Sequence, residues 1–300
     1  MGLAPFLFKF TPSPIFSNSF PSTSIDGPNT MTDTQTQTAT TQKRAEIEAA
    51  NQRLEGLVCD TDFEAMSPQE MMQWVGEAFE PSRTVISTSF QHSGMATIHM
   101  MHDLRLDLRI ATVDTLRLHP ETYAFIRDVE QHYDIEIEVH RPDAAEVESM
   151  TQRFGEYLFF DSKAKQEYCC QVRKTRPHDR LLKTADCWIS GLRRDQSPSR
   201  AKTPKAMTVS EYGSRRLIMK LNPLADWTEK QLREYTEAHK IPVNGLYAQG
   251  YESIGCVICS TPTTAGERPR AGRWRWFNRD GELGQEDLKE CGLHVPMYQI

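Results

Sequence analysis

The chain has 300 residues, of which 38% are hydrophobic and 25% charged, so it can bury a sizeable core in one large domain or two small ones. A formal net charge of −6 argues against a general nucleic-acid or membrane-surface binder, because such proteins need surplus positive charge. The longest apolar runs have strand length and are interrupted by charge, so no membrane span is expected. Seven cysteines without an obvious export signal favour a reducing compartment, and we expect a cytoplasmic protein.

Residues 1–45 are rich in Ser, Thr, Pro and Gln and lack apolar periodicity, which predicts a disordered extension. Met31 is an alternative first residue, and the composition leaves organelle targeting open. We expect residues 46–300 to form a single domain that ends in an irregular, mobile tail over about residues 275–300.

The ordered part opens with two predicted helices. A helical pattern covers residues 43–57, and Ser67-Pro68-Gln69-Glu70 supplies an N-cap, a proline at N1 and a carboxylate at N3 for a helix that ends near Phe79. Strands then alternate with amphipathic helices. The predicted strands are residues 84–88, 108–113, 135–139, 187–191 and 217–221, and the predicted helices are residues 95–104, 120–132, 143–153 and 228–239.

This alternation predicts an α/β fold with a doubly wound, mainly parallel sheet. In such sheets ligands bind beyond the carboxyl ends of the strands, which points to residues 87–94 and 114–118. The first of these loops is polar and contains Ser89, so its hydroxyls and a helix N-terminus could hold a phosphate. It matches neither a G-x-G-x-x-G nor a Walker loop, and alone it is a weak signal.

Four cysteines occur as two pairs, the neighbours Cys169 and Cys170 and the downstream Cys256-Val257-Ile258-Cys259. Thiolates in such numbers suit a zinc ion or an iron–sulfur cluster. Adjacent cysteines point in divergent directions, which the separate irons of a cluster accept better than one zinc does. We therefore favour a cluster and keep zinc as the alternative. A pair of buried thiols with no metal is the simplest structural explanation of Cys169 and Cys170.

A further cysteine, Cys291, lies in a non-periodic, glycine-flanked tail, where a core cysteine is not expected. Reactivity requires a thiolate near positive charge. Basic residues cluster at 173–174, 193–200 and 268–273, each beside a cysteine motif or a predicted strand end. By default such groups are solvated surface, but their positions favour an anion pocket that uses arginine to bind sulfate or phosphate.

Several motifs together carry a family resemblance. They are Cys169-Cys170-x-x-Arg173-Lys174, Gly191-Leu192-Arg193-Arg194-Asp195-Gln196-Ser197, Cys256-x-x-Cys259 and Glu290-Cys291-Gly292-Leu293-His294, and residues 113–123 look like a nucleotide-side motif. In this order they resemble the assimilatory adenylylsulfate (APS) reductases, close relatives of the phosphoadenylylsulfate (PAPS) reductases. The resemblance extends from about Ser67 to His294.

The resemblance implies an adenine nucleotide alpha-hydrolase-like fold and a thioredoxin- or glutaredoxin-dependent reduction of APS to sulfite and AMP. Cys169, Cys170, Cys256 and Cys259 would then ligate a four-iron four-sulfur (4Fe-4S) cluster, and Cys291 would attack the sulfate sulfur to form an S-sulfonate. The cations at the family's phosphate- and sulfate-binding positions are Lys174, Arg200, Arg270 and Arg273, with Ser89 on the nucleotide side. A homo-oligomer is left open.

The chain departs from the family pattern at Gln91-His92, where many members have a small, glycine-bearing loop, and at Thr115, where glycine is common. These departures concern the nucleotide contacts. No thioredoxin-like domain follows Cys291, so we expect a separate protein as reductant.

Other readings stay open. One is a PAPS reductase or an enzyme that accepts both nucleotides. A more remote one is an ATP pyrophosphatase-type sulfur transferase, although such an enzyme would need a Ser-Gly-Gly-x-Asp-Ser loop that Ser89-Phe90-Gln91-His92-Ser93-Gly94 does not match. A zinc-binding interaction module would leave Cys291 and the basic groups unexplained.

Overall fold

The computed structural model describes residues 33–210, 213–268 and 270–277. The chain divides into two units, residues 1–43 and 44–300, and the features below belong to the second. Helix α1 (Asp33–Asp60) crosses this boundary. Residues 33–45 are therefore helical, whereas the sequence predicted disorder there. Residues 33–43 contain neither proline nor glycine, and extending an existing helix costs far less than starting one.

Six strands form one sheet in the order β3-β2-β1-β4-β6-β5. They are β1 (Thr84–Ser87), β2 (Arg109–Val113), β3 (Ile137–His140), β4 (Cys187–Ser190), β5 (Ala206–Ser210) and β6 (Leu217–Leu221). All neighbours are parallel except β5, which pairs antiparallel with β6 at one edge. The predicted mainly parallel α/β sheet is confirmed, with β5 as an additional strand.

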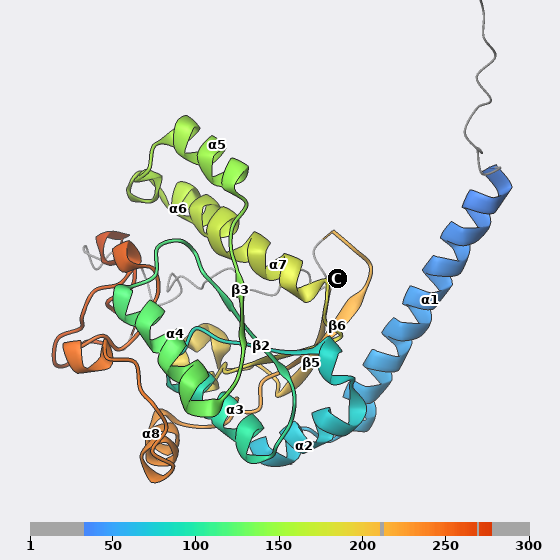
Figure 1. Ribbon diagram of the computed structural model, residues 1–300, viewed down its shortest axis with the longest axis horizontal. Coiled ribbons are helices and arrows are strands. Elements are labelled where there is room, and N and C mark those ends of the chain that lie inside the picture. Colours follow the sequence, from blue (N-terminus) through green and yellow to red (C-terminus); the bar gives the residue numbers. More distant parts are fainter. Residues whose placement is uncertain (1–32, 211–212, 269, 278–300) are drawn as a thin grey trace, which may run out of the picture. The chain divides into compact units, whose positions relative to one another are not determined.

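Helices cover both faces of the sheet because successive strand residues point to opposite sides (Figure 1). On one face, Val85 and Trp188 pack against α7 (Arg176–Leu182) through Leu181. On the other face, Ile86 and Ile189 belong to the largest core cluster. The helices that contribute to that cluster include α2 (Pro68–Ala78), α3 (His92–Asp103) and α4 (Pro120–Tyr133), and α8 (Glu229–Ala238) packs on α3.

The segment between β3 and β4 is more helical than predicted. Helix α5 (Ala144–Phe154) matches the expected stretch. Further along the chain, α6 (Lys163–Cys170), a π-helical turn η3 (Gln171–Thr175) and α7 form one continuous helical run. Short 3₁₀ turns complete the described elements at Pro81–Arg83, Leu158–Phe160, Arg194–Gln196, Pro198–Arg200, Tyr247–Gln249, Val257–Cys259 and Arg275–Phe277. Within the described ranges no helix is long and apolar enough to cross a membrane.

The strand order reverses beside β1, with β2 and β3 on one side and β4 and β6 on the other. In an open parallel sheet this reversal opens a crevice at the carboxyl ends of the strands. Gly191, directly after β4, lies so close to α3 that an added Cβ would stand 2.9 Å from the carbonyl carbon of Ser93. Glycine here lets the end of β4 lie against the start of α3.

Candidate active site

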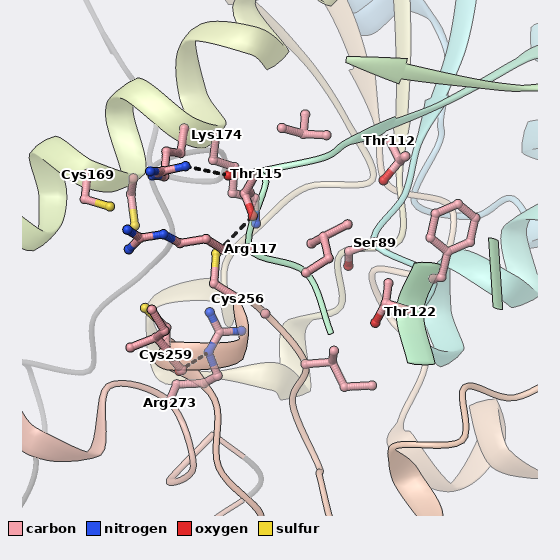
Figure 2. A pocket seen from close by; sticks show the side chains of 18 of the residues that line it. Ser89, Thr112, Thr115, Arg117, Thr122, Cys169, Lys174, Cys256, Cys259 and Arg273 are labelled. Carbon is pink, nitrogen blue, oxygen red and sulfur yellow. Dashed lines mark hydrogen bonds between the residues drawn. The ribbon is translucent and has the colours of Figure 1, made fainter. Parts of the chain in front are cut away.

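A cavity of about 120 Å³ lies at the carboxyl ends of β1 and β2 (Figure 2). One end is lined by hydroxyl groups, among them Ser89 in the loop after β1, Thr112 in β2 and Thr122 in the first turn of α4. The other end is lined by all four paired cysteines and by a set of cations. These residues are Cys169, Cys170, Cys256, Cys259, Arg117, Arg173, Lys174 and Arg273.

The cysteine pair closes helix α6, where Cys169 is buried and Cys170 half-buried. The amide Nε2 of Gln166, one turn earlier, donates a hydrogen bond of 2.9 Å to the Sγ atom of Cys170. The π-helical turn that follows places both Arg173 and Lys174 on the cavity wall. Such π-turns inside helices are frequent at functional sites.

The second cysteine pair lies on a 3₁₀ turn that is fastened to the loop after β2. The backbone N–H of Val257 donates to the carbonyl of Arg117 at 2.8 Å. The hydroxyl of Thr115 lies 3.3 Å from the Sγ atom of Cys256, and the carbonyl of Thr115 accepts a 3.1 Å bond from Arg173. Thr115 therefore links the two cysteine segments.

Burial and cations act in opposite directions on the thiols. Burial raises the pKa of Cys169, while the nearby Arg117 and Arg173 lower it. Burial also raises the pKa of Cys259 to about 12, and Arg273 opposes this shift. These thiols are therefore protonated in the metal-free fold, and only a further positive centre in the cavity would hold them as thiolates.

Arg273 comes from the C-terminal part of the cavity wall and is buried, with 9% of its surface exposed. Its Nε donates to the carbonyl of Cys259 at 3.2 Å, and its guanidinium lies 4.6 Å from the centre of the Trp274 ring. On the opposite side, Arg117 lies over the ring of Phe159 at 5.1 Å. Both guanidinium groups are held by packing before any ligand arrives.

The described cysteines are all free thiols. Among the described residues, no group of three or more His, Cys, Asp or Glu side chains is arranged to hold one metal ion. The four paired cysteines nevertheless line the same end of one cavity.

Of the predicted site residues, the structure brings Ser89, Lys174, Arg273 and the four cysteines to one cavity. Arg200 and Arg270 are not among its lining residues. Arg200 is buried on the turn Pro198–Arg200, where it donates to the side chain of Gln196. Cys291 lies outside the described residues.

Sequence reasoning did not assign individual roles to Thr115, Arg117 and Arg173. A signal was present, because Thr115 and Arg117 lie in the nucleotide-side motif of residues 113–123 and Arg173 precedes Lys174 in the basic run. Their contacts join segments far apart in the chain, and spacing alone does not reveal them.

Comparisons with known proteins show the family of the chain. A family model described as the phosphoadenosine phosphosulfate reductase domain matches residues 83–262. Adenosine 5'-phosphosulfate reductase of Sinorhizobium fredii is 39% identical over 251 residues, covering 84% of this chain and 91% of the relative. The enzyme of the same name from Allochromatium vinosum is 39% identical over 210 residues, covering 70% of this chain and 78% of the relative.

The fold is also similar to the crystal structure of a phosphoadenylyl-sulfate reductase from Candida auris in a phosphate complex. That structure has a TM-score of 0.55 and 24% sequence identity, and the match covers 71% of this chain and 97% of the other. With its family domain, its relatives and its fold in agreement, the chain belongs to the phosphoadenosine phosphosulfate reductase family.

Proposed function

We propose that the protein reduces APS to sulfite and AMP in sulfate assimilation, as the names of its relatives indicate for those proteins. One observation carries the proposal. A single cavity holds strand-end hydroxyls at one end and four cysteines with several cations at the other, which suits a substrate with a nucleoside half and a doubly anionic phosphosulfate half.

The nucleotide half fits the hydroxyl end. Ser87 ends the central strand β1, Thr88 and Ser89 follow it, and α3 begins shortly after this loop. The hydroxyls of this loop can serve the ribose as hydrogen-bond donors and acceptors. Ser89 is the residue we assign to this contact.

The phosphosulfate half fits the cationic end, where Lys174 and Arg273 join Arg117 on the wall. A thiolate that approaches a sulfate is repelled by its charge, and fixed cations at the sulfate oxygens lower that barrier. We keep Arg200 and Arg270 as further proposed substrate cations; Arg270 lies three residues before Arg273 in the chain.

The cysteine end also suits a 4Fe-4S cluster. Four free thiols from two segments line it, and Arg117, Arg173 and Arg273 offset the negative charge that four thiolates would bring. Cys169, Cys170, Cys256 and Cys259 would hold the cluster, since thiolates in such numbers are the usual ligands of its iron atoms. When bound, the cluster supplies a charged centre that fixes the two cysteine segments beside the substrate cations.

Cys291 is the proposed nucleophile. Its thiolate would attack the sulfate sulfur, forming an S–S bond while the bond from sulfur to the phosphate oxygen breaks and AMP leaves. A reduced dithiol protein, thioredoxin or glutaredoxin, would then supply two electrons, release sulfite by thiol exchange and become a disulfide. The electrons balance with APS as the oxidant and the dithiol protein as the reductant.

The test uses protein purified without oxygen, APS or PAPS in separate reactions, and reduced thioredoxin. We expect sulfite from APS, none from the Cys291→Ser variant, and unchanged iron content in that variant. The exposed Cys59→Ser is the matched control and should behave as the unaltered protein. Sulfite production by Cys291→Ser would contradict the mechanism. Turnover of PAPS but not of APS would show that PAPS, and not APS, is the substrate.

A further inference from the structure

Gln91 occupies a position where its residue type is not expected. It is the N-cap of α3, a position that favours Ser, Thr, Asp or Asn because their short side chains can bond to the first free N–H groups of the helix. The Gln91 side chain makes no such capping bond. It makes two other hydrogen bonds, one from its Nε2 to the hydroxyl of Ser89 at 2.9 Å and one to its Oε1 from the backbone N–H of Ile254 at 3.0 Å.

The two partners of Gln91 belong to different walls of the cavity. Ser89 lies in the loop after β1, at the hydroxyl end, and Ile254 lies shortly before Cys256, at the cysteine end. Ser89 and Ile254 are 165 residues apart in the chain, since 254 − 89 = 165. One side chain therefore joins the loop of the proposed nucleotide contact to the segment that carries a cysteine pair.

The segment of residues 254–257 depends on such bonds. Ile254 is 4% exposed and lies outside any helix or strand, so no ladder satisfies its N–H group. The next N–H group, of Gly255, donates to the hydroxyl of Ser260 at 2.9 Å, and Val257 donates to the carbonyl of Arg117 at 2.8 Å. A buried N–H that loses its partner is costly, so removing the Gln91 acceptor would loosen this segment.

A second contact runs in parallel with the first. The ring of His92 packs against the ring of Tyr247 with 4.1 Å between centres, and the His92 N–H lies 3.4 Å from the Tyr247 hydroxyl. Burial lowers the pKa of His92, so the imidazole is neutral and the contact between the two rings is one of packing. Tyr247 lies on the turn that leads towards Ile254. Gln91 and His92 thus both contact the downstream stretch of residues 247–254.

We infer that Gln91 is a positioning residue that couples the two ends of the cavity, so that a nucleotide at Ser89 steadies the segment that carries Cys256 and Cys259. The inference rests on the proposed function for its ligand. A nucleotide that fixes the Ser89 hydroxyl also fixes the acceptor of Gln91 Nε2. Gln91 Oε1 is then held in place on the Ile254 N–H, and the cysteine segment opens less often.

Amide hydrogen exchange at Ile254, on the full chain with and without AMP, tests the coupling. Gln91→Met keeps the length of the side chain but removes both bonds, and we expect Ile254 exchange to become at least about five-fold faster, in the range of typical coupling effects. Gln91→Glu keeps an acceptor and should restore slow exchange. The side chain of the exposed Gln249 donates to the side chain of Glu121, and Gln249→Met is the matched control.

Saturation with AMP should slow Ile254 exchange further in the unaltered protein and leave Gln91→Met unchanged. Ser89→Ala should lose the AMP effect, because it removes the hydroxyl through which the nucleotide acts on Gln91. Unchanged Ile254 exchange in Gln91→Met without nucleotide would overturn the positioning role, whatever AMP does. An AMP effect that persists in Gln91→Met would overturn the coupling. Failure of the unaltered protein to bind AMP would instead contradict the proposed function, and a separate calorimetric titration detects it.

Discussion

Replacing Gly255 with alanine should displace a proposed substrate cation without removing any charge. A Cβ at position 255 would overlap the guanidinium of Arg273, which is nine-tenths buried and bonded to the carbonyl of Cys259. The guanidinium would have to move away from this position, which weakens its charge-assisted bond; bonds of this kind are worth about 1.5–3 kcal/mol. Strain from the extra methyl group in a packed site typically costs about 1–3 kcal/mol.

We therefore expect Gly255→Ala to lower the free energy of unfolding by about 2 kcal/mol and to weaken APS binding about tenfold to a hundredfold, since about 1.4 kcal/mol corresponds to a factor of ten. Gly245→Ala is the control, because an added Cβ there meets nothing within 4 Å. Thermal unfolding and calorimetric titration with the nucleotide, on the Cys291→Ser background to prevent turnover, measure both effects. Equal affinity in Gly255→Ala and Gly245→Ala would refute the role given to Arg273.

Three further predictions concern buried groups. Cys259→Ser should lose iron and labile sulfide while Cys59→Ser keeps both, as measured by elemental and sulfide assays; equal iron in the two would contradict the ligand assignment. Burial lowers the pKa of His178 to about 3, so the unfolded chain binds its proton first and stability falls as pH drops from about 6.5 towards 3. In urea unfolding, His178→Gln should remove up to about 1.4 kcal/mol per pH unit from this slope, and an unchanged slope would refute the assignment. Burial also lowers the pKa of Lys220 to about 8, so the amine is charged at pH 7 at a cost to the fold. Lys220→Met should then gain stability at pH 7, and this gain should shrink as pH rises from 8 to 10.5 in the same assay; a gain that grows would contradict it.

Much of the parallel part of the fold was predictable because β1, β2 and β3 alternate with helices along the chain, although among the described residues no α-helix separates β4 from β6. Strand β5 was not, since Ala206–Ser210 is a largely half-buried edge strand whose pairing partner follows it antiparallel. The helical run from α6 to α7 was missed for a different reason. It has few apolar residues in its first half and contains Pro177, which is compatible with a helix start and gives no sign of a continuous run.

For the site, the sequence located the groups with distinctive chemistry, namely the cysteine pairs, Lys174, Arg273 and Ser89, and the structure places them on one cavity. The contacts that hold them in register were not predictable. Gln91 bonds to Ile254, and Thr115 joins Arg173 to Cys256, through segments whose proximity is set only by the topology of the sheet. Spacing within one segment carries no information about such pairs.

The most direct test of the proposed mechanism is the covalent state of Cys291 after incubation with nucleotide and no reductant. Protein prepared without oxygen is mixed with APS or with PAPS, and intact mass with peptide mapping locates any added sulfonate. We predict one sulfonate on Cys291 from APS, with release of an equal amount of AMP. A sulfonate on another cysteine, or release of AMP with no sulfonate on the protein, would contradict the account.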